Sequence, residues 1–246
     1  MFFEMIAFDA DDTLWYSESY YREAQAAMAA LLAAYRVERE AVLDALHRIE
    51  IANLAPFGYG IKGFTLSMIE AAIEATRGRV SAADIQAVID LGRAMTGHEI
   101  RLMAHSAEAV TRLAQTHPLM VITKGDLMDQ ERKIAASGLA SSFEWVEIVS
   151  DKTPEVYARL LQRHGIPPDR FLMVGNAIRS DILPVLAVGG WAVHVPYADS
   201  WAHESGAAPT GDGRFFTIDH LGQLPDLVGQ IEAGLPSSAQ SAQTHR

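Results

Sequence analysis

Short apolar segments that end in polar residues recur along the chain. Continuous apolar runs of this length, rich in Val, Ile and Phe, are typical of strands that are buried on both faces of a parallel sheet. A further segment, "RFFTID" at 214–219, predicts a peripheral strand. The five main segments are 5–10, 119–123, 145–150, 171–176 and 191–196.

Amphipathic segments separate the last four of these predicted strands. Thr153 followed by Pro154 predicts a helix start, because Thr caps the first turn and Pro fits its first position. Gly138, Gly165 and Gly189 stand where the predicted helices end. The alternation predicts βαβ units with right-handed crossovers, and therefore an α/β fold with a Rossmann-like parallel sheet between two helical layers.

Residues 16–97 interrupt this alternation with four Ala-rich segments of helical periodicity. Four helices exceed what one crossover needs, so we expect an inserted α-helical bundle that forms a separate domain. The alternative is that these helices pack on a face of the sheet. The core domain is then expected to comprise 1–15 and 98–236, and the polar segment 237–246 is expected to be a disordered tail.

Polar residues that could carry chemistry follow four of the predicted strands. The carboxyl ends of parallel strands meet at one edge of an open sheet, where ligands bind. We therefore expect these side chains to lie close together. They are Asp9 and Asp11 after the first strand, Thr123 and Lys124 at the end of the second, Lys152 after the third, and Asn176 and Asp181 after the fourth.

This set of residue types suits a reaction at a phosphate ester. One carboxylate can attack phosphorus, and a second, two residues along, can protonate the leaving alcohol and later activate water. A divalent cation held by carboxylates neutralises the phosphate charge, and Mg²⁺ prefers such oxygen ligands. A hydroxyl group and an ammonium group can hold the transferring oxygens.

Four motifs, in this order, resemble those of the haloacid dehalogenase superfamily on its phosphatase side. "DADDTL" is similar to the first motif, which implies that Asp9 is the nucleophile and Asp11 the general acid/base. Thr123 in "VITKGD" and Lys152 in "SDKTPEVY" match the second and third motifs, which implies catalytic roles for both. "VGNAIRSDI" resembles the fourth motif. The resemblance covers roughly residues 1–220 and implies that the helical insertion, 16–97, is a cap that closes over the site.

The same resemblance implies a Mg²⁺ site formed by Asp9, the Asp11 backbone carbonyl, Asn176 and Asp181. The family's fourth motif usually begins Gly-Asp, whereas this chain has Gly175 followed by Asn176. An amide oxygen can ligate Mg²⁺ but removes one negative charge. We therefore expect weaker metal binding than in an all-carboxylate site, with Asp181 ligating directly or through water.

Three further residues in or next to these motifs are candidates for substrate binding: Thr13, Lys124 and Gly125. Thr13 belongs to the first motif, where its hydroxyl group is expected to support a catalytic aspartate. Backbone N–H groups at Lys124 and Gly125 are expected phosphate donors, and the Lys124 side chain is either functional or solvated. Asp12 lies outside the catalytic positions and is expected to serve a turn or a helix cap.

Two loops have open roles. The stretch "PFGYGIKGF" at 56–64 holds three glycines that are expected to break two helices. Lys62 within it either meets an anionic part of the substrate, as a substrate-binding residue, or is solvated. Trp201, His203 and Glu204 either line the entrance of the site or form a packed or solvent-facing loop.

Composition limits the partners of the 246-residue chain. Its formal net charge of −11 argues against a nucleic-acid polymer, which needs stripes of Lys and Arg. The chain has no cysteine, so a disulfide framework or a cysteine nucleophile is excluded. The N-terminal segment lacks a basic region and no apolar run could span a bilayer, so we expect a cytoplasmic protein without a membrane partner. The oligomeric state is left open.

The predicted function is a Mg²⁺-dependent phosphomonoester hydrolase that acts on a small phosphorylated metabolite through an aspartyl-phosphate intermediate. A sugar-phosphate mutase of the superfamily would share both aspartates and is an open alternative. A haloacid dehalogenase fits less well, because halide needs no protonation and Asp11 would have no task. A non-catalytic phospho-ligand-binding protein is a further alternative, suggested by Asn176.

Overall fold

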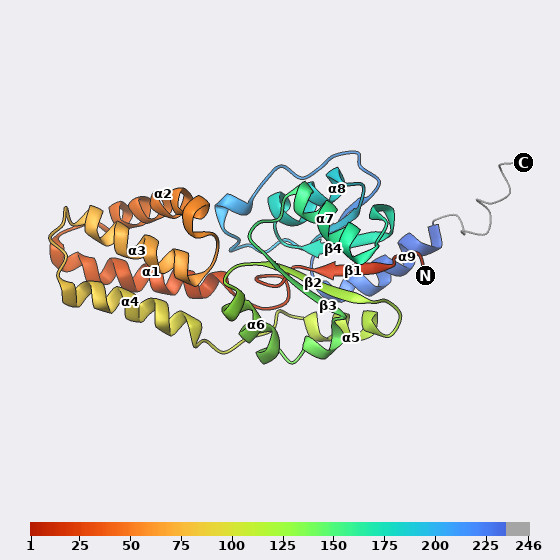
Figure 1. Ribbon diagram of the computed structural model, residues 1–246, viewed down its shortest axis with the longest axis horizontal. Coiled ribbons are helices and arrows are strands. Elements are labelled where there is room, and N and C mark those ends of the chain that lie inside the picture. Colours follow the sequence, from red (N-terminus) through yellow and green to blue (C-terminus); the bar gives the residue numbers. More distant parts are fainter. Residues whose placement is uncertain (235–246) are drawn as a thin grey trace, which may run out of the picture.

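A six-stranded parallel sheet forms the centre of the chain in the computed structural model, which describes residues 1–234 (Figure 1). The strand order is β3-β2-β1-β4-β5-β6. All five main strands and the peripheral strand predicted from the sequence are confirmed. The predicted tail, 237–246, lies outside the described residues. The strands are β1 Met5–Phe8, β2 Leu119–Lys124, β3 Trp145–Val149, β4 Phe171–Gly175, β5 Trp191–His194 and β6 Phe215–Thr217.

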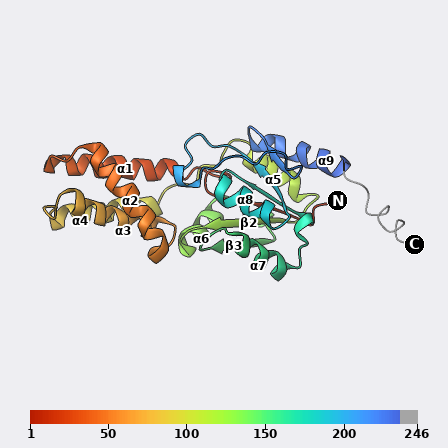
Figure 2. The ribbon, with the colours of Figure 1, turned by 90° about the horizontal axis from the view of Figure 1, so that it is seen from above.

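Side chains alternate between two apolar cores along each central strand, as the period of two requires. Phe8, Val121 and Val174 join the core on one face, where helices α5, α6 and α9 pack. Their neighbours Ala7, Met120 and Met173 join the core on the other face, with helices α7 and α8. Figure 2 shows α5 and α9 on one side of the strands and α7 on the other. The three-layer fold is confirmed, and the helices are α5 Ser106–Ala114, α6 Leu127–Ala136, α7 Pro154–His164, α8 Leu183–Ala187 and α9 Leu224–Gly234.

Local signals set the helix ends. The Thr153 side chain accepts a hydrogen bond from Val156 N at 3.4 Å and Pro154 opens α7, as predicted. The predicted helix after β4 is divided, because a π-helical turn at Ile178–Ile182 precedes α8. Helices α5 and α9 were not predicted, although the segment of α5 has buried apolar residues at helical spacing.

Four helices from the insertion pack around an apolar core of their own. Figure 1 shows them as an elongated bundle that extends from one end of the sheet, not as a layer on its face. The inserted bundle of the predicted fold is therefore present, while the domain boundaries stay a prediction. Its buried core includes Met28, Leu32, Val42, Leu46, Phe64, Met68 and Val88. The helices are α1 Glu18–Leu32, α2 Arg39–Phe57, α3 Ile61–Ala75 and α4 Ala82–Thr96.

The link between α2 and α3 is shorter than the sequence suggested. Helix α2 continues through Phe57 and α3 begins at Ile61, so only three residues connect them. The prediction that all three glycines break helices is wrong for Gly63, which lies inside α3. A Cβ atom there would come within 2.9 Å of the Gly58 carbonyl oxygen, so close packing accounts for this glycine.

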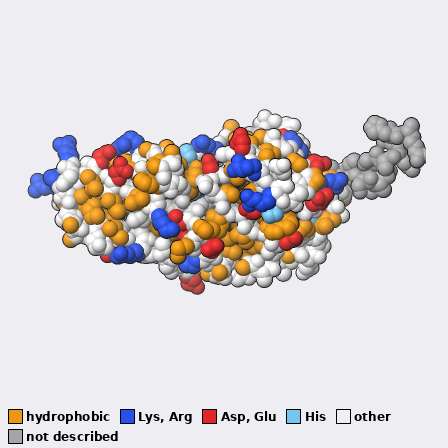
Figure 3. Space-filling view, in the orientation of Figure 1, with side chains coloured by type: hydrophobic (Ala, Val, Ile, Leu, Met, Phe, Trp, Pro, Cys, Tyr) orange, Lys and Arg blue, Asp and Glu red, His pale blue; other side chains and the backbone are white. Residues whose placement is uncertain are grey.

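Within residues 1–234, no helix combines the length and apolar character needed to cross a membrane. Figure 3 shows acidic and basic side chains interspersed on the face in view, with no continuous basic band.

Candidate active site

Sheet register places the predicted catalytic residues at one edge. Phe8, the last residue of β1, pairs with Val121 of β2 and with Val174 of β4, and both of these strands continue past it toward the same edge, to Lys124 and Gly175. Asp9 follows β1 directly, and its Oδ1 atom lies 2.5 Å from the Lys152 ammonium group. That ammonium group also lies 2.7 Å from Asp181 Oδ1.

Burial dominates the electrostatics of this cluster. It raises the pKa of the Asp9 carboxyl to about 7, against the opposing effect of Lys152 and with a further increase from Asp181. Burial also works against the Lys152 ammonium group, but Asp181 and Asp9 outweigh it and raise the Lys152 pKa. Lys152 therefore stays protonated between the two carboxyl groups, at 1% side-chain exposure.

Asp181 approaches the backbone of the fourth motif closely. A Cβ atom at Gly175 would lie 2.2 Å from Asp181 Oδ2, so only glycine fits there. The same oxygen accepts a hydrogen bond from Ala177 N at 3.0 Å. Both carboxylate oxygens of Asp181 thus have protein partners.

Asp11 is held by a different set of groups. Its two carboxylate oxygens each lie 3.0 Å from the Lys133 ammonium group. Gln130 Nε2 and Trp15 Nε1 each donate a hydrogen bond to it at 2.8 Å. Burial raises the Asp11 pKa, but Lys133 and these donors outweigh it, so the pKa is lowered. Sequence reasoning missed Gln130 and Lys133, although their three-residue spacing puts both on one face of α6.

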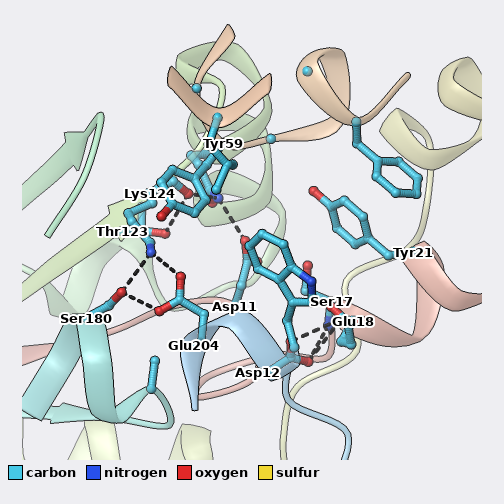
Figure 4. Close-up of a pocket in the computed structure, with 18 of the residues that line it drawn as sticks. Asp11, Asp12, Ser17, Glu18, Tyr21, Tyr59, Thr123, Lys124, Ser180 and Glu204 are labelled. Carbon is cyan, nitrogen blue, oxygen red and sulfur yellow. Dashed lines mark hydrogen bonds and ion pairs between the residues drawn. The ribbon is translucent and has the colours of Figure 1, made fainter. Parts of the chain in front are cut away.

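The Lys124 side chain is buried and paired, so it is not solvated, which was one of the two alternatives for it. The side chain is 12% exposed, and its ammonium group bonds to Glu204 and, at 2.7 Å, to Ser180 Oγ. The Tyr59 ring centre lies 3.9 Å from that ammonium group. Figure 4 shows Lys124 between Glu204 and Ser180, with Tyr59 beside it. Sequence reasoning missed Ser180 and Tyr59 as partners.

Trp201 and Glu204 line the cavity that contains these residues, so for these two residues the structure agrees with the first of the two alternatives left open for this loop. His203 lies instead near Arg179, whose guanidinium group donates to the His203 carbonyl oxygen at 3.0 Å.

Thr13 bridges two candidate residues. Its hydroxyl group lies 3.0 Å from Asp9 Oδ2 and 3.2 Å from Asn176 Oδ1, and it accepts a hydrogen bond from Asn176 N. Asp12 serves α1 instead, since its carboxylate accepts hydrogen bonds from Ser17 N and Glu18 N. The predicted capping role of Asp12 is confirmed.

The remaining candidates lie in different places. Thr123 is buried and lines the cavity. Gly125 has a φ of 133°, and a Cβ atom there would meet Gln130 Nε2 at 2.9 Å. Lys62 does not line the cavity: its side chain is 67% exposed and its ammonium group lies 3.6 Å from Asp126. A contact between Lys62 and substrate stays a prediction.

One cavity joins the sheet edge to the helical bundle. It has about 1070 Å³ of empty space, part of which is open to solvent. Strand-end residues and α6 form one wall, while α1, α2 and α3 form the other. A molecule the size of a phosphorylated metabolite would therefore contact both parts of the chain.

The sequence model of the haloacid dehalogenase-like hydrolases matches residues 3–189. The chain belongs to this family. This match confirms the resemblance inferred from the four motifs. In this chain, the residues of those motifs lie together at one edge of the sheet.

Similar proteins agree with this assignment. N-acylneuraminate-9-phosphatase of Mus musculus is 23% identical over 95% of this chain and 96% of that protein. The crystal structure of a haloacid dehalogenase-like family hydrolase from Xanthomonas campestris has a TM-score of 0.85 and 42% identity, over 94% of this chain and 93% of that one. A 2-haloacid dehalogenase structure from Pseudomonas syringae, with a TM-score of 0.62, 21% identity and 93% and 99% coverage, shares the fold.

The oxygen atoms expected to hold Mg²⁺ in this hydrolase fit the metal in donor type. Asp9 Oδ2 and Asn176 Oδ1 are brought together because both contact the Thr13 hydroxyl group. Asp181 Oδ1 and Oδ2 already have partners, which favours ligation by Asp181 through water. Among residues 1–234, no group of three or more His, Cys, Asp and Glu side chains has metal-binding geometry. An Mg²⁺ ion would therefore depend on the Asn176 amide and on the Asp11 carbonyl in addition to Asp9.

Proposed function

We propose that the chain is a phosphomonoester hydrolase that requires Mg²⁺ and acts on a small phosphorylated metabolite. The observation that carries the proposal is the placement of Asp9: a buried carboxyl group, paired with Lys152 and Thr13, that lines the cavity between the sheet edge and the helical bundle. The second carboxylate, Asp11, lines the same cavity. The similarity to N-acylneuraminate-9-phosphatase supports the same class of reaction.

In the proposed reaction, Asp9 attacks phosphorus and forms a phosphoaspartate while the bond from phosphorus to the ester oxygen breaks. Asp11 gives a proton to the leaving alcohol, then takes one from the water that hydrolyses the phosphoaspartate and releases phosphate. Lys152 and Thr123 hold the transferring oxygens. Mg²⁺, bound by Asp9, the Asp11 carbonyl and Asn176, would neutralise phosphate charge.

The contacts of Asp11 suit its proposed role as a base better than its proposed role as an acid. Lys133 keeps Asp11 ionised, which suits the base that activates water. To act as an acid, Asp11 must first take up a proton and turn from Lys133 toward the leaving oxygen. We propose that entry of the substrate between the two walls brings about this change, and that residues 16–97 act as the cap.

The test is phosphate release from p-nitrophenyl phosphate, with Mg²⁺ and with the metal removed by EDTA. We expect activity with Mg²⁺, its loss with EDTA, and its absence in Asp9→Asn. Asp44→Asn is the matched control, because Asp44 is exposed on α2. Halide release from 2-chloropropionate, or Asp9→Asn activity equal to that of the control, would contradict the proposal.

A further inference from the structure

The two walls of the cavity differ in charge. Its three lysines all come from the sheet part of the chain: Lys124, Lys133 and Lys152. The wall contributed by residues 17–67 has no Lys, Arg or His among its described lining residues. It carries two carboxylates instead, Glu18 on α1 and Glu50 on α2.

Neither carboxylate on the bundle wall has a full counterion. Glu50 forms no hydrogen bond or ion pair with any residue in the described part of the chain, and burial raises its pKa. Glu18 has its nearest cation in Arg22, at 3.9 Å, and that half-exposed guanidinium group is bound to Asp199. A largely buried carboxylate without a partner is unfavourable, and a bound cation or hydroxyl donor would relieve it.

Neutral groups on the same wall also offer hydrogen-bond acceptors. Asn53 uses its amide N–H groups on Ser67 Oγ, at 3.1 Å, and on Glu70, at 3.0 Å, which leaves its carbonyl oxygen for a ligand. Tyr21 packs edge-on against Phe64, with ring centres 4.9 Å apart, and adds a flat apolar surface. Figure 4 shows the Tyr21 ring directed into the space between the walls. The wall therefore suits a ligand with hydroxyl or amino donors on a carbon skeleton.

The charge of the whole cavity lining also favours a cationic group on the substrate. Eight carboxyl groups and three lysines surround the cavity, and one Mg²⁺ ion would offset only the two charges of a phosphate ester. A second anionic group on the substrate would meet uncompensated negative charge, whereas a cationic group would be attracted.

We propose that the alcohol released by this hydrolase carries hydroxyl groups and an ammonium group, and no carboxylate. Glu18 and Glu50 contact the ammonium end of the substrate while Asp9 and Lys152 contact its phosphate. The inference rests on the proposed phosphatase activity and names its substrate class as phosphorylated amino alcohols, with amino sugars among them.

The test compares three six-carbon phosphates of similar size: glucosamine 6-phosphate, glucose 6-phosphate and 6-phosphogluconate. We expect kcat/KM to fall in that order, by about tenfold or more from the first to the last. Equal or better hydrolysis of 6-phosphogluconate than of glucose 6-phosphate would overturn the inference. If only p-nitrophenyl phosphate is hydrolysed, the same order is required of the three compounds as competitive inhibitors. No release from any compound would overturn the proposed function and this inference together.

Two variants tie the preference to its residues. Glu50→Gln and Glu18→Gln each remove a carboxyl group that can ionise against a bound ammonium group, with little change of shape. In either variant we expect the preference for glucosamine 6-phosphate over 6-phosphogluconate to fall by about fivefold or more. Glu40→Gln, an exposed change on the same helix as Glu50, should keep the preference. An unchanged preference in both cavity variants would contradict the assignment.

Discussion

Replacing Glu50 by Gln should stabilise the protein, and the gain should depend on pH. Burial raises the pKa of the Glu50 carboxyl in the folded chain from 4.5 to about 7, and no described cation opposes this. A carboxyl group whose pKa is raised on folding holds its proton more tightly in the folded chain than in the unfolded chain. Its contribution to stability is fully present below the unfolded pKa, where the group is protonated in both states, and is lost as the pH rises to the folded pKa. Wild-type stability therefore includes a penalty at Glu50 that develops between these two values.

The size of the effect follows from the shift. Each pKa unit corresponds to about 1.4 kcal/mol, so full ionisation of Glu50 would cost about 3 kcal/mol of the free energy of unfolding. Solvent that reaches the carboxyl group makes this an upper bound. Glu18 adds to the penalty, because its pKa is raised to about 8 by burial and then by its acidic neighbours Asp12 and Glu50.

Urea unfolding of the wild type, Glu50→Gln and the exposed control Glu40→Gln at about pH 5 and about pH 8 measures the effect. We expect Glu50→Gln to be more stable than wild type by about 1–3 kcal/mol at the higher pH, and by a small fraction of this at the lower pH. The control should show no such pH-dependent gain. A Glu50→Gln protein that is no more stable at about pH 8, or whose gain is the same at both pH values, would refute the reasoning.

Three further changes test other parts of the structure. Asp12→Ala removes the acceptor for Ser17 N and Glu18 N and should cost about 1–2 kcal/mol of unfolding free energy, with Asp12→Asn close to wild type; equal losses in both would contradict the capping role. Asn176→Asp should lower the Mg²⁺ concentration that gives half-maximal activity, because it adds a negative charge to the expected metal site; an unchanged titration would reject the idea. Lys133→Met should cost about 3 kcal/mol, because Asp11 and buried Asp129 lose the ammonium group that they share while Asp129 keeps only Arg132, and Asp129→Asn in the same chain should recover part of this loss in urea unfolding.

The fold could be predicted from the sequence because its signals are local. The central strands β1, β2 and β4 are apolar up to their polar or glycine ends, since alternate residues face two different cores. The parallel arrangement then places Asp9, Thr123 and Asn176 at one edge without further information. Lys152 contacts Asp9 and Asp181 for the same reason, because all three residues follow strands that end at this edge.

The rest of the site depends on packing between distant segments. Lys133 reaches Asp11 only because α6 folds back over the end of β1, and Glu204 reaches Lys124 from a loop 80 residues along the chain. In the link between α2 and α3, the residue at which α3 begins determines which side chains reach the site. Because α3 begins at Ile61, Tyr59 stays in the link and reaches Lys124, while Lys62 joins the helix and pairs with Asp126.

Stability and substrate choice meet at Glu50. If the carboxylate had only a structural task, Gln would serve better at neutral pH, since it has the same shape without the charge. The penalty falls on a residue that lines the cavity, where a bound ammonium group would offset it. Glucosamine 6-phosphate should therefore raise the melting temperature of the wild type more than glucose 6-phosphate does, and this difference should shrink in Glu50→Gln. A difference that persists unchanged in Glu50→Gln would separate the stability effect from substrate recognition and place the ammonium group elsewhere.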